Sequence, residues 1–211
     1  MAVAKKINTV IITGDIIASS KLTPVKRKKL QNRVNTFVKK ITDSLPDFKS
    51  EQFRGDSLQC ILTKNRTAGL RTALSLYCFL AAEGFKIRQS VGIGEVTYNS
   101  GNVVTSDGTA FRISGENVDD LKKRNELISV AFADGLFNEE WKVHSASLNF
   151  LLERLSDAQA EAVYLQLQNA RQEEIAKALH ISQPSVHQRL QAAGWIVINR
   201  VLQRFETVTA G

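Results

Sequence analysis

Two aspartates, each directly after a glycine, are the residues of this chain best suited to chemistry. Gly14-Asp15 follows the apolar, β-branched run INTVIIT, and Gly55-Asp56 lies between two short strand-like runs, FKSEQF and SLQCIL. Two carboxylates held close together repel one another unless a cation lies between them. Mg²⁺ or Mn²⁺ would supply that cation and keep coordination positions for a phosphate ligand. The alternative is that each aspartate only caps a turn, as Gly-Asp pairs often do.

The elements that would position these aspartates follow from the hydropathy pattern. Residues 7–13 and 87–96 have the composition of buried strands, and residues 24–45 and 68–83 carry apolar side chains at helical spacing. Together with the two strand-like runs, the order is β-α-β-β-α-β, the ferredoxin-like pattern. Its strands lie in the order 4-1-3-2, so the first and third are antiparallel neighbours. Asp15, just past the end of the first strand, would then lie beside Asp56, just before the third.

Basic residues gather in one part of the chain. The 211 residues include 28 Lys and Arg against 21 Asp and Glu, a net charge of +7. Residues 156–211 carry five of each sign, so the whole excess precedes them. Eight basic residues and no acidic one lie from Lys21 to Lys40, a stripe that suits phosphate or another polyanion. A solvated helix face has the same appearance, because long cationic side chains also cover apolar surface.

The composition is that of an ordinary globular protein, with 43% hydrophobic and 23% charged residues. Disordered, collagen-like and disulfide-stapled classes are therefore excluded. Cys60 and Cys78 each lie in an apolar run, which is typical of reduced core residues. The apolar stretch near the N-terminus is too short for a signal peptide or a membrane span. We expect a cytoplasmic protein with no membrane partner.

A second pattern, QEEIAKALHISQPSVHQRLQ at residues 172–191, is a helix-turn-helix signature. His180 lies at the turn, where a left-handed backbone is usual, Ser182 caps the second helix, and Val186 and Leu190 point inward. The outer side of the second helix would face the DNA major groove, where glutamine pairs with adenine and arginine with guanine. The candidate DNA-binding residues are Gln183, Ser185, His187, Gln188 and Arg189. The alternative is a helical hairpin used for dimerisation.

Four short motifs carry a family resemblance. GDIIASSK (14–21), FRGDSLQCIL (53–62), VGIGEV (91–96) and DGTAFRIS (107–114) look like the SatD family of bacterial proteins. They are similar in turn, in order and spacing, to the palm domain of class III nucleotidyl cyclases. The resemblance implies that Asp15 and Asp56 bind Mg²⁺ or Mn²⁺. It also implies that the segment after the first strand holds the triphosphate of a nucleoside triphosphate, since helix N-termini favour anions. The implied nucleotide- and phosphate-binding residues are Ile16, Ile17, Ser19, Ser20, Lys21 and Arg112.

Three positions depart from the cyclase pattern. One is Gln52, where the resemblance implies a lysine, four residues before Asp56, that helps to choose the base. Where cyclases carry an asparagine and an arginine that stabilise the transition state, this chain has Arg112 and Glu116. A glutamate cannot replace a cation next to a developing negative charge. The resemblance therefore implies a palm that binds metal and nucleotide, and it leaves catalytic turnover open.

The expected fold is α+β. It consists of a ferredoxin-like βαββαβ palm domain (1–137), a linking helix (138–155) and an all-α helix-turn-helix domain (156–211) that resembles bacterial transcription regulators and the promoter-reading region of sigma factors. The expected function is a DNA-binding transcription regulator whose palm binds a metal-nucleotide or a related phosphate ligand. We also expect a homodimer, because helix-turn-helix proteins commonly pair on palindromic half-sites. One alternative is a nucleotidyl cyclase or polymerase-palm type of enzyme, acting on nucleoside triphosphates, with the C-terminal helices used for assembly. Another is a plain protein-interaction module.

Overall fold

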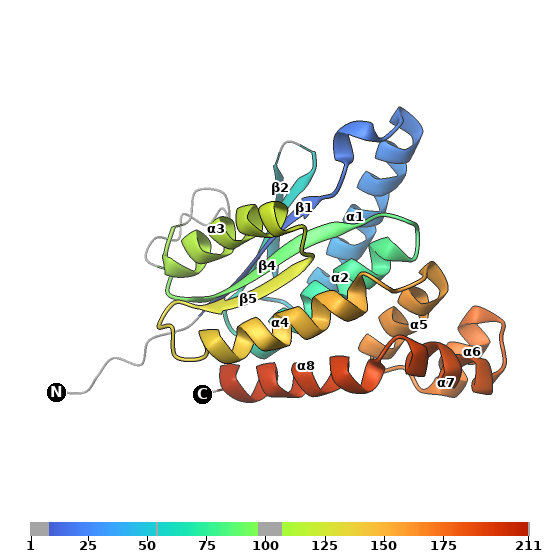
Figure 1. Cartoon of the computed structure of the whole chain (residues 1–211). Coiled ribbons are helices and arrows are strands. Elements are labelled where there is room, and N and C mark those ends of the chain that lie inside the picture. Colours follow the sequence, from blue (N-terminus) through green and yellow to red (C-terminus); the bar gives the residue numbers. More distant parts are fainter. Residues whose placement is uncertain (1–8, 54, 97–106, 211) are drawn as a thin grey trace.

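The structure is a computed structural model that describes residues 9–53, 55–96 and 107–210 (Figure 1). One sheet has the order β2-β3-β1-β4-β5 and consists of β1 (Thr9–Ile16), β2 (Lys49–Phe53), β3 (Ser57–Leu62), β4 (Ile87–Gly94) and β5 (Ile128–Phe132). The helices are η1 (Ser19–Lys21), α1 (Pro24–Ser44), η2 (Arg66–Ala68), α2 (Gly69–Ala81), α3 (Thr109–Arg124), α4 (Asn138–Leu152), α5 (Asp157–Leu167), α6 (Gln172–Leu179), α7 (Gln183–Ala192) and α8 (Trp195–Thr209). The α+β class and the order of the first four strands are confirmed, and β5 adds a parallel strand beside β4.

Local signals define where α1 begins. The Thr23 hydroxyl accepts a hydrogen bond from the Lys26 amide, and Pro24 occupies the first helical position, where its missing N–H costs nothing. The buried side chains along the helix recur at intervals of three or four residues and are Leu30, Val34, Phe37 and Ile41. This face joins α1 to the apolar core that it shares with α2 and one side of the sheet.

Strand β1 is longer than the hydropathy pattern predicts. The prediction ended it before Gly14, whereas pairing with both β3 and β4 continues as far as Asp15, which lies opposite Ser57 and Arg88. A Cβ at Gly14 would lie 2.8 Å from the end of the Ile87 side chain, which would have to shift to admit it. Asp15 therefore lies inside a central strand, which corrects the expectation that it follows the strand.

The two faces of the sheet differ in polarity. Val10, Ile12 and Ile16 of β1 point into the large apolar core on the side of α1 and α2. The alternate residues Thr13 and Asp15 point to the side covered by α3, because side chains alternate along a strand. One row on that side is polar on every strand and consists of Glu51, Gln59, Thr13, Ser90 and Ser129. The sheet thus has one apolar face and one largely polar face.

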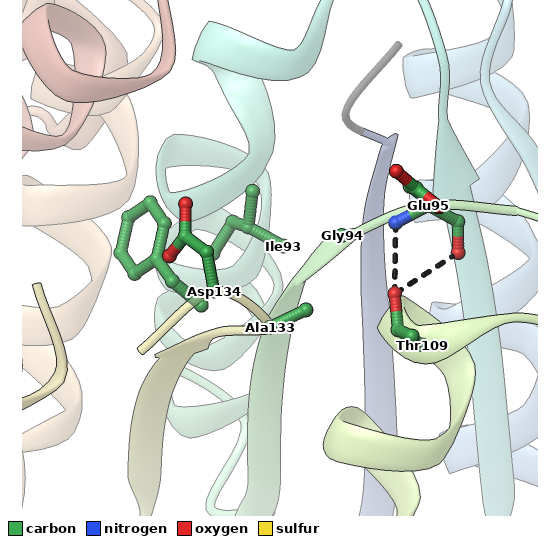
Figure 2. Close-up of a pocket in the computed structure, with 7 residues that line it drawn as sticks. Ile93, Gly94, Glu95, Thr109, Ala133 and Asp134 are labelled. Atoms are coloured by element: carbon green, nitrogen blue, oxygen red, sulfur yellow. Dashed lines mark hydrogen bonds between the residues drawn. The ribbon is translucent and has the colours of Figure 1, made fainter. Parts of the chain in front are cut away.

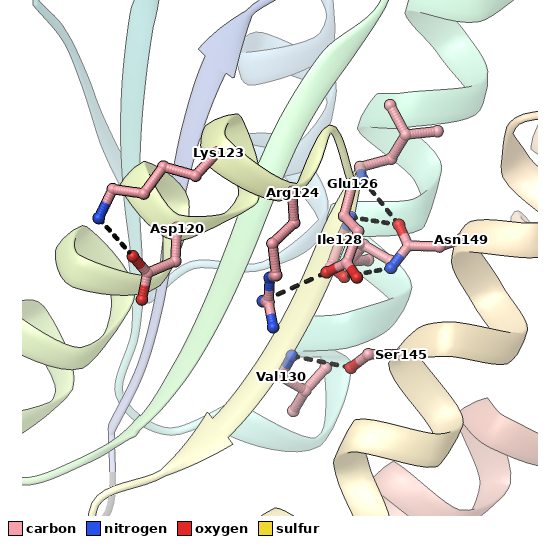
Figure 3. A network of polar contacts seen from close by, with 9 residues as sticks. Asp120, Lys123, Arg124, Glu126, Ile128, Val130, Ser145 and Asn149 are labelled. Carbon is pink, nitrogen blue, oxygen red and sulfur yellow. Dashed lines mark hydrogen bonds and ion pairs between the residues drawn. The ribbon is translucent and has the colours of Figure 1, made fainter.

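The free edge of β5 is covered by polar side chains of α4 (Figure 3). Asn149 accepts hydrogen bonds from the Leu127 and Ile128 amides at 2.7 and 2.9 Å and donates to the Ile128 carbonyl at 2.9 Å. The Val130 amide donates to Ser145. Edge strands otherwise expose unpaired backbone groups that can recruit another chain. Helix α4 therefore seals this edge of the sheet.

The C-terminal helices share the hydrophobic core of the sheet domain. The ring of Tyr164 on α5 packs on Phe79 of α2, with ring centroids 4.9 Å apart. Arg71 of α2 donates to the Leu167 carbonyl and forms an ion pair with Glu206 of α8 at 3.0 Å. The helix-turn-helix segment is thus held against α2 by both apolar and charged contacts.

Two further expectations concern the cysteines and the absence of a membrane span. Cys60 and Cys78 are buried core residues, as expected, and burial raises the pKa of both thiols. Within the three described ranges, no helix is both long enough and apolar enough to cross a lipid bilayer.

Candidate functional site

Asp56 lies in the turn between β2 and β3, next to the start of α1. Its carboxylate accepts a hydrogen bond from the Ser19 hydroxyl at 2.8 Å, and its carbonyl accepts one from the Ile16 amide at 2.9 Å. A pocket of about 170 Å³ opens at this point and is lined by Ser19, Ser20, Leu22, Arg27, Leu30, Gly55 and Asp56. Its hydroxyls and guanidinium suit a phosphate group, whereas the Asp56 carboxylate would need a cation between itself and the phosphate.

Asp15 has different partners. Its carboxylate accepts a hydrogen bond from Ser57 at 3.4 Å and forms an ion pair with Lys122 of α3 at 3.2 Å. The Asp15 side chain is only 15% exposed, whereas the Lys122 side chain is 48% exposed, so only the carboxylate end of the pair is shielded from solvent. Sequence analysis missed Lys122, because a lysine in the last turn of a helix is also what the helix dipole favours. The lysine already places a positive charge where a metal was predicted.

The fit of these residues to a metal ion is therefore partial. Carboxylate oxygens are the ligands that Mg²⁺ and Mn²⁺ prefer, and backbone pairing brings Asp15 and Asp56 to the same end of adjacent strands. However, a metal at Asp15 competes with the Lys122 ammonium. In the part of the chain that the structure describes, no cluster of three or more His, Cys, Asp or Glu is placed to hold a metal. Metal binding by the two aspartates stays a prediction.

The predicted phosphate-binding residues fall into two groups. The amides of Ile16 and Ile17 are already used, because they donate to the carbonyls of Asp56 and Lys86 at 2.9 Å. Of the other predicted residues, Ser19 and Ser20 line the pocket, and Lys21 is exposed beside it. The exposed Arg112 side chain belongs to α3, which packs on the opposite face of the sheet from α1. Arg27, which the prediction left out, lies in the pocket instead.

A second pocket, of about 230 Å³, lies where β4 and β5 end (Figure 2). The Thr109 hydroxyl accepts a hydrogen bond from the Glu95 amide at 2.9 Å and so fixes the start of α3 against the end of β4. Gly94 permits this approach, because a Cβ there would lie 2.6 Å from the Thr109 hydroxyl. Asp134 also lines the pocket, which makes it acidic and poorly suited to an anion.

The helix-turn-helix has the predicted geometry. His180 ends α6 with a left-handed backbone at φ 53° and ψ 42°, and the Ser182 hydroxyl caps α7 by accepting a hydrogen bond from the Ser185 amide. Val186 and Leu190 are buried on the inner side of α7. The predicted caps and inner face are therefore confirmed.

The candidate DNA-binding side chains are not all equally accessible. Gln183, His187 and Gln188 are exposed on the outer side of α7. The half-buried Ser185 shares a hydrogen bond with Ser182, and the half-buried Arg189 donates to the Ala158 carbonyl of α5 at 3.5 Å. Of the five candidates, two glutamines and a histidine are thus exposed on α7, while Arg189 leans toward α5.

Comparison with sequence families identifies the C-terminal part. Residues 145–193 match the family described as Sigma-70, region 4. The match begins within α4, before the expected boundary at residue 156, and it continues through α5, α6 and α7. The chain therefore contains a helix-turn-helix unit of the sigma-70 region 4 type. No curated protein sequence matches the chain.

Several solved structures resemble part of the chain. A bacterial light-regulated adenylyl cyclase matches with a TM-score of 0.43 and 19% identity, over 60% of this chain and 77% of that one. The adenylyl cyclase CyaB from P. aeruginosa matches with a TM-score of 0.42 and 13% identity, over 54% and 71%. The guanylyl cyclase Cya2 matches with a TM-score of 0.38 and 12% identity, over 54% and 70%. The chain is thus distantly similar to cyclases in part of its fold, whereas the resemblance to the SatD family stays a prediction.

Proposed function

We propose that this protein is a DNA-binding transcription regulator that contacts DNA through the outer side of α7. The observation that carries the proposal is the sigma-70 region 4 match, which includes α6 and α7, together with the exposure of Gln183, His187 and Gln188 on α7. Glutamine side chains form paired hydrogen bonds with adenine in the major groove. An exposed row of such groups on the second helix of a helix-turn-helix is the surface that this recognition needs.

The neutral charge of the C-terminal segment means that further cations must contribute to affinity. Protein–DNA affinity depends strongly on neutralising backbone phosphates with lysine and arginine. Helix α1 supplies exposed cations at Lys26, Arg27 and Lys28, whereas Lys29 is paired with Glu83 at 2.6 Å. Lys40 at the far end of α1 donates to the Tyr164 hydroxyl of α5 and so joins the basic helix to the helix-turn-helix unit. In our proposal, α1 contacts DNA phosphates that flank the α7 site.

Selection of binding sequences from a random DNA pool, followed by fluorescence anisotropy on the selected site, tests the α7 contacts. Gln183→Ala and Gln188→Ala should each weaken binding to that site by about 1–3 kcal/mol and relax its sequence preference. Gln203→Ala is the matched control, because Gln203 is also exposed but lies on α8. If the full chain enriches no sequence, or if the α7 variants bind like the control, DNA recognition by α7 is refuted.

The salt dependence of the same binding tests the role of α1. Reversal of Lys26 and Lys28 to Glu should lower the slope of log affinity against log salt by roughly 0.9 for each DNA phosphate that these lysines neutralise, with no change in sequence preference. The control is Lys123→Glu on α3, which packs on the other face of the sheet. If the Lys26/Lys28 variant and the Lys123 control show the same salt slope, α1 does not contact the flanking DNA phosphates.

The proposal also gives the sheet domain a ligand, a metal-nucleotide or a related phosphate compound. Support comes from the pocket at the start of α1, which is lined by Ser19, Arg27 and Asp56. Backbone pairing also brings Asp15 and Asp56 to the same end of adjacent strands, with the Asp15 side chain on the α3 side of the sheet. Asp15 and Asp56 would hold the metal, which would supply positive charge to offset that of the carboxylates and the phosphate. Ser19 and Arg27 would hold the phosphate, and Lys122 would have to leave Asp15 to admit the metal.

Thermal unfolding with Mn²⁺ and each nucleoside triphosphate tests this ligand. A ligand at a hundred times its dissociation constant should add about 2.7 kcal/mol of stability. Asp56→Asn and Arg27→Ala should abolish the shift, whereas Lys122→Ala should strengthen metal binding by freeing Asp15. If no triphosphate shifts the unfolding temperature, the ligand proposal fails. Formation of a cyclic nucleotide in the same mixtures, detected by mass spectrometry, would instead support the cyclase-type enzyme.

A further inference from the structure

One side of α4 is apolar although it is exposed to solvent. Val143 and Phe150 are 66% and 58% exposed, and they lie on the same side of the helix because they are seven residues apart. The small residues Ala146 and Ser147 lie between them. The same stripe begins with the exposed Glu139 and ends with Arg154, whose guanidinium covers the Phe150 ring at 3.8 Å; we call it the α4 stripe.

Helix α8 widens this apolar surface. It runs antiparallel to α4, since Arg204 pairs with Glu140 near one end and Gly194 meets Leu151 at the other. Figure 1 shows the two helices side by side. Between them lies a groove of about 360 Å³, which is lined by His144, Ser147, Ile196, Val197, Arg200 and Val201.

This concentration of apolar side chains needs an explanation. Six large hydrophobic residues are exposed in the described part of the chain, and four of them belong to α4 and α8. They are Val143, Phe150, Ile196 and Val197. Contiguous apolar patches on a folded surface usually mark a site of association.

We propose that the α4 stripe binds a second copy of this chain, with the two α4 helices antiparallel about a two-fold axis between Ala146 and Ser147. In such an isologous contact, two residues of the stripe that are equally far from the axis face one another, one from each copy. Val143 then lies opposite the partner's Phe150, next to the groove. Glu139 lies opposite the partner's Arg154. The small central residues let the two helices approach closely.

The charges of the stripe favour this occupant and this orientation. An acidic residue at one end and a basic residue at the other, equally far from the centre, make the stripe complementary to itself only when the helices are antiparallel. A parallel pair would place Glu139 against the partner's Glu139, which is unfavourable. Glu139 also pairs with Lys142 of its own helix at 2.5 Å, but both side chains are well exposed and such pairs contribute little.

Charge reversal tests the register in dilute solution by analytical ultracentrifugation of the full chain. Wild-type protein should dimerise, and Glu139→Arg or Arg154→Glu should each raise the dimer dissociation constant by more than about tenfold, because like charges then face one another twice. A mixture of the two variants should recover the dimer as a heterodimer, since opposite charges again meet at both ends. Failure of the mixture to recover it overturns the proposed register.

Phe150→Asp tests the apolar part of the contact, and Val25→Asp is its control, because Val25 is also an exposed hydrophobic residue but lies on α1. Phe150→Asp should abolish the dimer, whereas Val25→Asp should leave it intact. A single cooperative unfolding transition in each variant shows that both fold. A wild-type chain that stays monomeric, or a dimer that survives Phe150→Asp, overturns the proposal. None of these measurements involves DNA, so their failure is distinct from failure of the proposed function.

Discussion

Replacement of Asn149 by alanine should destabilise the protein far more than its size suggests. The Asn149 side chain is 6% exposed and makes three hydrogen bonds to the backbone at the start of β5. Alanine leaves two amides and one carbonyl without these partners. A buried backbone group without a partner costs about 1–3 kcal/mol. Because water can enter the space that the amide vacates, we take the lower part of the range and expect a loss of about 3 kcal/mol.

Two substitutions on the same helix calibrate this value. Ser145→Ala removes a single acceptor, for the Val130 amide at 3.2 Å, and should cost about 1 kcal/mol. Ser147→Ala removes a half-exposed hydroxyl that donates within the helix to the Val143 carbonyl, and it should change stability by less than about 0.5 kcal/mol. The expected order of destabilisation is therefore Asn149, Ser145 and Ser147.

Urea unfolding, followed by the fluorescence of the buried Trp141, measures the three free energies. The slope against urea should stay constant, because the exposed surface of the unfolded chain does not change. The reasoning is refuted if Asn149→Ala costs no more than Ser147→Ala. A second consequence is testable by light scattering: loss of the α4 side chains that cover β5 should increase aggregation near the unfolding midpoint.

Three further predictions concern other contacts. Arg204, with help from His144, lowers the pKa of Glu140 to about 2, below its value of about 4.3 in the unfolded chain. The stabilisation is therefore present above about pH 4.3 and is lost as the pH falls towards 2. Glu140→Gln should flatten the pH dependence of the unfolding free energy in that window. Arg71→Ala, which breaks the contacts of α2 with Leu167 and Glu206, should lower the unfolding free energy by about 1–3 kcal/mol. Arg112→Ala, at an exposed arginine, is the control, and an equal effect of the two variants would contradict this prediction. Ser182→Ala removes the cap of α7 and should cost about 1 kcal/mol by urea unfolding, whereas Ser182→Asp should restore it; equal stability of the alanine and aspartate variants would refute the capping role.

Much of the fold could be predicted because its signals are local. Thr23-Pro24 and Ser182 sit at helix starts, where a hydroxyl or a proline satisfies or removes an orphan backbone donor, and both helices begin there. The alternation of strands and helices was enough to give the order of the first four strands. The turn at His180 could be predicted because the turn of a helix-turn-helix needs a residue with a left-handed backbone, which few residue types adopt readily.

The candidate sites depended more on contacts between distant parts of the chain. Asp15 could be singled out from its neighbours, but its ion pair with Lys122 joins residues more than a hundred positions apart. Arg189 has the spacing of a DNA-contacting residue, and only the packing of α7 on α5 turns it toward the Ala158 carbonyl. The length of β1 beyond Thr13 likewise depends on β3 and β4 extending alongside it.

The sequence by itself determined the elements, the turn chemistry and the residue types available for metal, phosphate and DNA, because propensity, capping and periodicity act over a few residues. The tertiary structure decided which of these groups are already satisfied. Asn149 looks like an ordinary helix residue until β5 lies beside it, and Phe150, its neighbour, looks like a core residue although it is exposed. A helix periodicity specifies which side chains share a face, but only the packed neighbours determine which face is left for solvent or for a partner.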